Sequence, residues 1–392
     1  MRKTADVVII GGGAAGTSTA YYLSKMGVKN VVLVEQNYTP FGGTGRCAAM
    51  FRLQFGSVSN CKLGLLSVSQ FDVLGEESGF GDLEISKHGY LLPAYNEEEL
   101  EGLKKNVDLQ HTMDIPSMIL DQKGCKEVAP YLDVSEMIGG SYCTGEGTIN
   151  PQKMALAFKK GAQSRGVEFY NYTTVTGIRV EAGKVKGVIT DKGEIATECV
   201  VNATGEWGKF IGRMAGVTIP VEPEKHQICI TEPLEYLGGP MIYSFKYGTY
   251  ISQVKHGGFL MGWSDPNVEA GIIDFNTEWR VLEELCRRVV KQVPALANVR
   301  IVRHWAGQYG NGPDHSIIVG PVPEVEGFIC ALGMTKATMF APAIGILAAE
   351  SVVKAKPSLP MEPYTIDRFA KAIWLSIRPF CKGKLRKCEF KI

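Results

Sequence analysis

The chain has 392 residues, of which 45% are hydrophobic and 21% are charged, values typical of a globular protein large enough for two domains or one composite domain. Its formal net charge of +1 argues against nucleic acid or a membrane surface as the partner. No stretch approaches the roughly 20 apolar residues of a membrane span, and the start MRKTADVVII lacks a signal peptide's apolar core, so we expect a cytoplasmic protein.

The N-terminal segment predicts a nucleotide-binding βαβ unit. Val7–Ile10 is a short, wholly apolar run, which suits a buried parallel strand and is too short for a helix. A helix is expected over 14–26, and a second apolar strand over 31–34 ends in Glu35. Strand, helix, strand and terminal carboxylate follow one another as a dinucleotide-binding unit requires.

Three glycines in G-x-G-x-x-G spacing lie between the first strand and the helix. Gly11 allows the tight turn, Gly13 lets the backbone approach a pyrophosphate, and Gly16 lets helix and strand pack closely. The helix N-terminus offers amide donors to phosphates, and Glu35 offers an acceptor to ribose hydroxyls. We therefore expect an adenine dinucleotide here, without a preference between NAD and FAD.

The next segments mix loops, helices and short strands. Residues 38–56 predict a glycine-rich loop leading into a helix. Residues 84–148 predict short strands and turns around one helix near 97–108. Pro151 occupies a favourable first position of a further helix, whose end is marked by Gly166.

The second half of the chain has strong β character. A third parallel strand is expected over 167–170, followed by hairpins that turn at Ala182-Gly183 and Lys192-Gly193. A buried strand then ends in NATGEW, and residues 221–264 and 298–320 are rich in strands. An amphipathic helix separates these two regions, and strand, loop and helix follow from residue 327.

Six further segments carry a resemblance to a known family. They are GRCAAMFRLQFG (45–56), NATGEW (202–207), VEPEKHQ (221–227), FKYGTYISQVKHGG (245–258), WAGQYGNGPDHSIIVG (305–320) and ALGMTKATMFAPAIG (331–345). With the glycine fingerprint, they resemble the FAD-dependent D-amino-acid oxidase superfamily, and within it the branch of sarcosine oxidase β subunits and dye-linked L-proline dehydrogenase β subunits. The likeness runs to about residue 365.

The resemblance implies an α/β fold with a discontinuous Rossmann-type FAD-binding domain and an antiparallel-sheet α+β substrate domain. We expect the first over 1–83, 150–220 and 315–365, and the second over 84–149 and 221–314. Residues 366–392 are expected to form a C-terminal tail whose Cys381 and Cys388 suit a surface or subunit contact more than a metal site. No cysteine pair has C-x-x-C spacing, so no metal is expected.

Three small-residue turns end apolar strands, at 11–16, 203–205 and 333–338, and an extended cofactor such as FAD needs several backbone approaches of this kind. The expected cofactor contacts are Gly11, Gly13, Ala14, Ala15, Gly16, Glu35, Gln36, Gly43, Thr44, Arg46, Cys47, Val175, Ala203, Thr204, Gly205, Trp207, Gly307, Gly333, Met334, Thr335 and Lys336. Relatives that tether FAD use a cysteine before the Pro-Asp motif; WAGQYGNGPD has none, so noncovalent FAD is expected.

The resemblance implies oxidation of an amino or imino acid, proline-like or sarcosine-like, at its carbon–nitrogen bond. Such a substrate needs a cation for its carboxylate, and the flavin needs positive charge or N–H groups near N1 and C2=O. Arg52 is expected at the carboxylate, with Arg46 as the second candidate, and Lys336 at the flavin. Lys336 lies where relatives carry a G-x-S-G-H-G-like loop, so this sequence departs from the family there.

Histidines and tyrosines complete the expected site. His256 is the predicted catalytic histidine, and His226 also matches a family histidine; a purely structural role explains either of them equally well. Tyr247 and Tyr250 are candidates for the pocket wall, although strand packing explains them too.

Two other functions stay open at this point. One is a flavoprotein dehydrogenase of 2-hydroxy acids or of glycerol phosphate, and the other is a non-catalytic flavin-binding subunit of an electron-transfer complex. The electron acceptor would be a dye, a quinone, a partner flavoprotein or oxygen, and the resemblance also implies hetero-oligomeric partner subunits.

Overall fold

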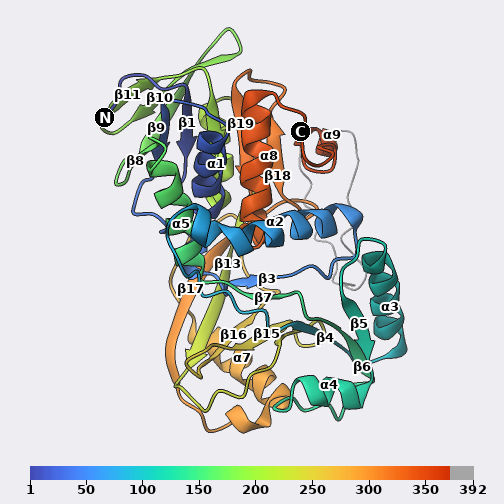
Figure 1. Cartoon of the computed structure of the whole chain (residues 1–392). Coiled ribbons are helices and arrows are strands. Elements are labelled where there is room, and N and C mark those ends of the chain that lie inside the picture. The colour runs from blue at the N-terminus through green and yellow to red at the C-terminus, as the bar shows by residue number, and fades with distance from the viewer. Residues whose placement is uncertain (371–392) are drawn as a thin grey trace.

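The computed structural model describes residues 1–370, so Cys381 and Cys388 lie outside the described part. Two large sheets organise this part of the chain, one in the upper half of Figure 1 and one in the lower half. Within residues 1–370, none of the helices combines the length and the apolar character that a membrane crossing requires.

The upper sheet has six strands in the order β18-β19-β12-β1-β2-β8. Neighbours run parallel except β18 and β19, which are antiparallel. This confirms the predicted α/β class and the third parallel strand. The strands are β1 (Val7–Ile10), β2 (Val31–Val34), β8 (Glu168–Tyr170), β12 (Val200–Asn202), β18 (Ile318–Pro321) and β19 (Phe328–Leu332).

Alternation along β1 divides the core of this half into two layers. Val7 and Ile9 pack with the helical layer, whereas Val8 and Ile10 pack with the layer on the other side. The helical layer consists of α1 (Ala14–Lys25), α2 (Val58–Glu77), α5 (Pro151–Gln163) and α8 (Ala341–Val353). The second layer is a three-stranded sheet with a short helix: β9 (Val175–Glu181), β10 (Lys184–Thr190), β11 (Gly193–Ala196) and α6 (Gly208–Met214).

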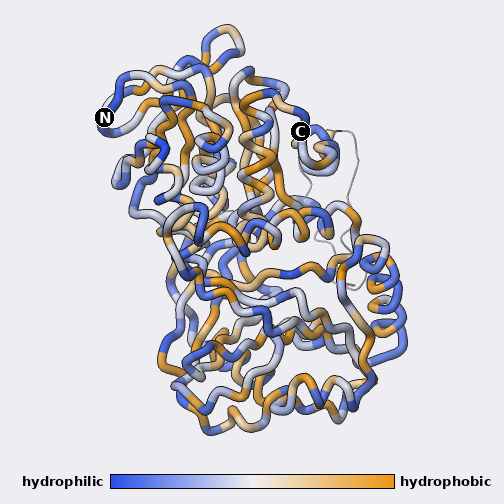
Figure 2. The backbone as a smooth tube through the Cα atoms, viewed as in Figure 1, coloured by the Kyte–Doolittle hydropathy of each residue, from blue (hydrophilic) through white to orange (hydrophobic). Residues whose placement is uncertain are grey.

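Burial explains the hydropathy of the helices in this half. Helix α8 is buried from Ala341 to Glu350 between α1, α2 and the sheet, and it is mostly hydrophobic in Figure 2. By contrast α3 (Glu97–His111), at the edge of the lower half, is mostly hydrophilic. Its first turn carries three glutamates, which the helix dipole favours.

The lower sheet has eight strands in the order β17-β13-β16-β15-β14-β4-β6-β5, antiparallel except between β14 and β4. Helix α7 (Trp279–Gln292) covers one face, and Tyr90, Met241 and Tyr250 lie on the other. The strands are β4 (Tyr90–Ala94), β5 (Ser117–Leu120), β6 (Gly139–Cys143), β13 (Glu222–Thr231), β14 (Met241–Ser244), β15 (Thr249–Gln253), β16 (Phe259–Trp263) and β17 (Ile301–Asn311). A small sheet of β3 (Met50–Phe51) and β7 (Gly147–Thr148) joins the halves.

The structure differs from the sequence predictions in two segments. Helix α4 (Gln122–Val128), capped by Asp121, lies where only strands and turns were predicted, because seven residues are too few to show a helical apolar period. Residues 366–370, predicted as the start of a tail, pack into the fold instead. Arg368 is 1% exposed and forms a bidentate ion pair with the buried Asp314, at 2.7 and 3.0 Å.

The two large sheets draw their strands from different parts of the chain. The six-stranded sheet draws on 7–34, 168–202 and 318–332, and the eight-stranded sheet on 90–143 and 222–311. The exact domain boundaries stay a prediction.

Candidate active site

A cavity of about 720 Å³ runs between the two halves of the molecule. It begins at the turn after β1 and ends at the loop after β19. The predicted cofactor residues that line it are Gly11, Gly13, Ala14, Ala15, Glu35, Gln36, Gly43, Thr44, Cys47, Val175, Ala203, Thr204, Gly205, Trp207, Gly333, Met334, Thr335 and Lys336. A single long cavity thus connects all three small-residue turns.

The glycines at one end form a cradle that side chains would fill. Gly11 has φ +105°, and a Cβ there would lie 2.6 Å from the Ala203 carbonyl oxygen. Gly13 faces Thr44, whose hydroxyl accepts from the Ala14 amide at 2.9 Å. The start of α1 therefore offers the backbone approach that a diphosphate needs.

Glu35 closes this end beside the cradle. Its carboxylate accepts from the amides of Gly12 and Asn37 at 2.7 and 2.8 Å. Burial raises the pKa of Glu35, and these two hydrogen bonds oppose the shift. Glycine cradle, carboxylate and extended cavity together fit the ADP part of FAD, as the spacing predicted.

At the other end, Arg52 and Lys336 face the cavity together. Arg52 forms no ion pair with any carboxylate of residues 1–370, and its buried Nε has no hydrogen-bond partner there. Its guanidinium lies over Phe55 and Tyr90, 4.6 and 5.5 Å from the ring centres. This end thus holds an arginine whose charge is available to a carboxylate.

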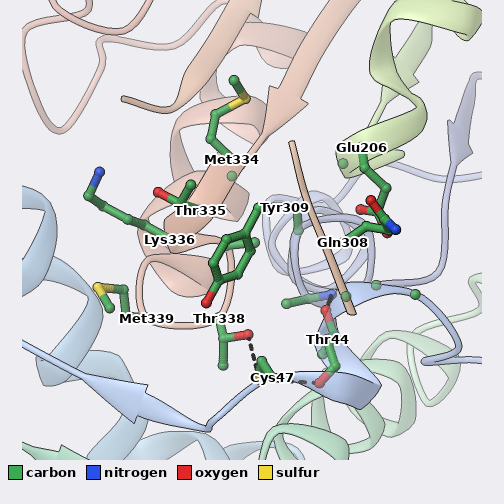
Figure 3. Close-up of a pocket in the computed structure, with 18 of the residues that line it drawn as sticks. Thr44, Cys47, Glu206, Gln308, Tyr309, Met334, Thr335, Lys336, Thr338 and Met339 are labelled. Atoms are coloured by element: carbon green, nitrogen blue, oxygen red, sulfur yellow. Dashed lines mark hydrogen bonds between the residues drawn. The ribbon is translucent and has the colours of Figure 1, made fainter. Parts of the chain in front are cut away.

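Lys336 belongs to the 3-10 helix η4 (Met334–Lys336), directly after β19. Its Nζ donates to the His315 carbonyl oxygen. Burial, together with the charge of Arg52, lowers the pKa of Lys336 to about 8. The lysine is therefore a cation at neutral pH that loses its charge in mildly alkaline solution. Figure 3 shows it beside Thr335 on the loop that forms this wall.

Glu146 positions the segment that presents Arg52. This carboxylate is fully buried and accepts from the amides of Leu53 and Gln54 at 2.5 and 2.6 Å. It also accepts from Nε2 of Gln54 at 2.8 Å, and that amide bonds the Tyr90 carbonyl. Burial raises the pKa of Glu146 to about 7, against these hydrogen bonds. Glu146 thus ties the residues after Arg52 to the eight-stranded sheet.

Glu146→Ala is expected to lower the free energy of unfolding by about 2–4 kcal/mol, because it leaves two buried amides without an acceptor. Urea denaturation measures this. Glu146→Gln keeps one acceptor oxygen and should lose less, so equal losses in the two variants would contradict the role assigned to these hydrogen bonds.

A polar group on β13 and β17 faces the same space. His226 lies against the ring of Tyr309 at 4.2 Å, and its Nε2 is 3.8 Å from Glu224. Burial raises the pKa of Glu224, but contacts with His226 and Asn311 outweigh burial and lower the pKa below its usual value. Nδ1 of His315 lies 2.8 Å from Oδ1 of Asn311. All of these side chains line the cavity.

Cys47 lies on the wall between the two ends. Burial raises the pKa of its thiol, and its Sγ is 3.3 Å from the Thr338 hydroxyl, as Figure 3 shows. A neutral, hydrogen-bonded thiol favours packing over reactivity.

Five predicted site residues do not line the cavity. Gly16 packs against Gly11, where a Cβ would lie 1.9 Å from the carbonyl oxygen, so it acts through helix–strand packing. Gly307 packs against Arg46, whose guanidinium lies between Phe41 and Phe275 at 4.2 and 4.3 Å. Arg46 therefore braces the cavity wall from behind.

His256 and Tyr247 lie elsewhere. His256 is exposed in the turn between β15 and β16, whereas Tyr250 and Ser264, toward the other end of that hairpin, line the cavity. A histidine in a KHGG turn is carried to the tip of the hairpin, away from the site. Tyr247 donates to the exposed Glu136 at 3.0 Å. Of the two candidate histidines, the structure brings His226 to the cavity.

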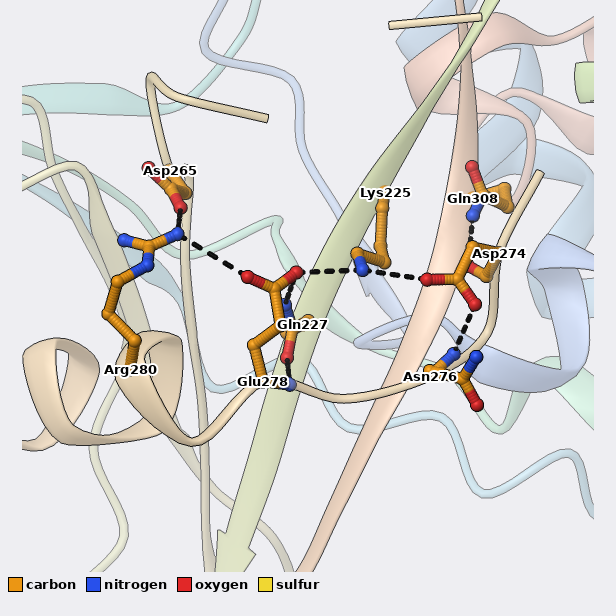
Figure 4. A network of polar contacts seen from close by, with 8 residues as sticks. All are labelled: Lys225, Gln227, Asp265, Asp274, Asn276, Glu278, Arg280 and Gln308. Atoms are coloured by element: carbon orange, nitrogen blue, oxygen red, sulfur yellow. Dashed lines mark hydrogen bonds and ion pairs between the residues drawn. The ribbon is translucent and has the colours of Figure 1, made fainter. Parts of the chain in front are cut away.

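Several lining residues escaped sequence reasoning, among them the buried Glu206 and Gln308 and the half-buried Tyr309. Gln308 is held by the segment before α7, because its Nε2 donates to the Asp274 carbonyl. Figure 4 shows how ion pairs of Lys225 with Asp274 and Glu278, at 2.9 and 2.7 Å, fix that segment to β13. Such contacts link residues far apart in sequence and leave no local pattern.

Comparison with known proteins agrees with this geometry. A family model described as DAO, FAD dependent oxidoreductase, matches residues 6–351. The L-proline dehydrogenase from P. horikoshii has a similar structure, with a TM-score of 0.90 and 35% identity over 95% of this chain and 99% of that one.

Curated relatives extend the comparison. The sarcosine oxidase subunit beta of Rhodobacter capsulatus is 26% identical, over 94% of this chain and 89% of its own length. The mitochondrial sarcosine dehydrogenase of Homo sapiens is 29% identical over 94% of this chain, which spans only 42% of that protein. Because the family match covers most of the chain, this protein belongs to the DAO family of FAD-dependent oxidoreductases.

Proposed function

We propose that the protein oxidises the carbon–nitrogen bond of a small amino or imino acid, proline-like or sarcosine-like. The observation that carries this proposal is the half-buried Arg52, which faces the cavity and forms no ion pair in the described chain, although Glu146 acts on it electrostatically. A substrate carboxylate supplies that partner, and a planar guanidinium holds it in a fixed orientation.

The chain's own residues bind and orient the substrate. Arg52 holds the carboxylate, and the apolar wall of Tyr90, Met241 and Tyr250 excludes water. A dry site next to cations favours the neutral amine, which is the form that reacts. His226, backed by Glu224, faces the same space and is our candidate for holding the proton that the amine gives up.

FAD, when bound, supplies the hydride acceptor, and its negative charge after reduction favours a nearby cation. The ADP part would lie along the Gly11–Gly16 turn and Glu35, and the flavin end near Gly333–Lys336. We infer noncovalent binding, since Cys47 has a raised thiol pKa and a hydrogen-bond partner in Thr338.

Anaerobic mixing of the FAD-loaded protein with candidate substrates tests the proposal. Loss of flavin absorbance with L-proline or sarcosine supports it. Bleaching only by 2-hydroxy acids or glycerol phosphate would establish the alternative dehydrogenase, and bleaching by none of them would favour a non-catalytic flavin subunit. A dye acceptor then measures turnover.

The partners and the acceptor are proposals too. Likeness to sarcosine oxidase subunit beta supports assembly with further subunits, and a dye, a quinone, a partner flavoprotein and oxygen are the acceptors to compare. The cytoplasmic location stays a prediction.

Lys336→Met is expected to slow flavin reduction about 10-fold, because a cation that stabilises developing negative charge is lost. The wild-type rate should fall above pH 8, where Lys336 loses its proton, and the variant should lack this step. Stopped-flow spectroscopy measures the rate, and a lower flavin midpoint potential should accompany the loss. Lys336→Arg keeps the charge; if it is as slow as the methionine variant, charge is not the cause.

A further inference from the structure

Glu206 is a buried carboxyl group in the wall of the cavity. It lies in the 3-10 helix η2 (Gly205–Trp207), directly after β12, and is 5% exposed. Its Oε1 is inaccessible and has no hydrogen-bond partner among residues 1–370. A buried polar atom without a partner is costly, and a buried charge without one is costlier still.

No cation forms an ion pair with Glu206 in the described part of the chain. Arg46 acts on it electrostatically, but the Arg46 guanidinium donates to the carbonyl oxygens of Phe41 and Gly42 and is held between two aromatic rings. Burial raises the pKa of Glu206 to about 8. The group is therefore mostly a neutral acid at pH 7, and a neutral acid is a hydrogen-bond donor.

Its neighbours are the residues along which the middle of a long cofactor would run. A Cβ built on Gly42 would lie 3.7 Å from Oε1 of Glu206, and one on Gly43 would lie 3.8 Å from Oε2. Gln308 lines the same wall, and its buried Oε1 also has no partner in the described chain. Figure 3 shows Glu206 and Gln308 together, opposite the segment that carries Thr44.

We propose that Glu206 binds FAD as a neutral carboxylic acid, donating a hydrogen bond to an oxygen of the ribityl–diphosphate part. The protonated carboxyl has a hydrogen to give, and the cofactor supplies the acceptor that residues 1–370 do not. An ionised Glu206 would instead repel the diphosphate, so cofactor affinity depends on this proton.

Other charged groups surround η2 and enter any pH dependence. The elements packed against it, α6, β13 and β17, carry Lys209, Arg213, Glu222, Glu224, Lys225, His226, Arg303 and Tyr309 among others, and Glu35, Arg46 and Asp274 lie nearby. Lys209 is paired with Glu222, and Asp274 with Lys225. The charges that act on Glu206 most strongly are those of Arg46 and Glu35. Lys336, at the far end of the cavity, titrates in the same pH range. The test therefore compares the pH dependence of the wild type with that of a Glu206 variant.

The experiment titrates full-length protein, stripped of FAD, with FAD and follows flavin fluorescence at pH 6.5 and pH 9. A carboxyl group with a pKa of about 8 is roughly nine-tenths ionised at pH 9. If only the neutral acid binds FAD, ionisation of Glu206 should therefore lower the wild-type affinity for FAD about 10-fold between pH 6.5 and pH 9. Glu206→Gln, a neutral donor of the same size, should match wild type within about 3-fold at pH 6.5 and lose that 10-fold component.

Glu206→Leu removes the donor at similar volume and should weaken FAD binding about 10-fold or more at pH 6.5. Equal weakening by Glu206→Gln and Glu206→Leu, or a wild-type pH dependence in Glu206→Gln, would overturn the proposal. If Glu206→Leu fails to fold by circular dichroism, the glutamine variant alone decides. Infrared difference spectra of FAD-loaded minus stripped protein should also show a carboxylic-acid C=O band that Glu206→Gln lacks.

Discussion

Arg52→Ala is expected to raise KM for a carboxylate substrate about 100-fold, equivalent to roughly 3 kcal/mol of lost binding. Among residues 1–370, the guanidinium is the group at this end that matches a carboxylate in shape and charge, and its buried Nε has no partner there. Because its loss weakens ground-state binding and misorients the carbon–nitrogen bond, kcat should fall as well. Steady-state assays with a dye acceptor measure both constants.

Arg300→Ala is the matched control, because the Arg300 side chain is 85% exposed and should leave KM unchanged. FAD content should stay at the wild-type level in the Arg52 variant, which separates substrate binding from cofactor loss. An Arg52→Ala protein with wild-type KM for its amino acid would show that another group binds the carboxylate.

Gly16→Ala is expected to abolish stable FAD binding. A Cβ at this position would lie 1.9 Å from the Gly11 carbonyl oxygen and 3.3 Å from the Ala203 side chain, so α1 must move away from β1. That movement separates the amides of α1 from the glycine turn that receives the diphosphate. The purified variant should be colourless, with less than about a tenth of the wild-type flavin absorbance per chain, a loss of over 10-fold in occupancy.

Gly177→Ala serves as the comparison within the same half of the molecule. Its added Cβ would meet only Ile189 at 3.5 Å, an ordinary contact, so flavin content should be preserved. A yellow Gly16→Ala protein with full flavin occupancy would contradict the packing argument.

Much of the fold could be predicted because its signals are local. Short apolar runs such as Val7–Ile10 and Val31–Val34 suit buried strands, and glycine spacing marks the turn from the first strand into α1. Arg52 and Lys336 both line the cavity. Their roles toward substrate and flavin remain proposals.

The site residues that sequence reasoning misplaced or missed have one property in common, which is that their positions depend on contacts across the fold. His226 and His256 are equally good candidates as letters in a motif, and only strand pairing puts one on the cavity wall and the other at a hairpin tip. No sequence motif around Glu206 or Glu146 identifies these two residues as part of the site. Their importance lies in burial and in partners across the fold, which a linear sequence does not display.

The buried ion pair of Asp314 and Arg368 limits how far the chain can be truncated from its C-terminal end. Cutting after residue 365 would remove Arg368 and leave the buried carboxylate of Asp314 without its arginine partner. Breaking such a pair costs about 3–5 kcal/mol, a large share of a typical domain's stability. Because Asp314 lies next to His315, whose carbonyl receives Lys336, the damage would reach the flavin end of the cavity. The last turn of the described chain thus stabilises the flavin end of the cavity through Arg368.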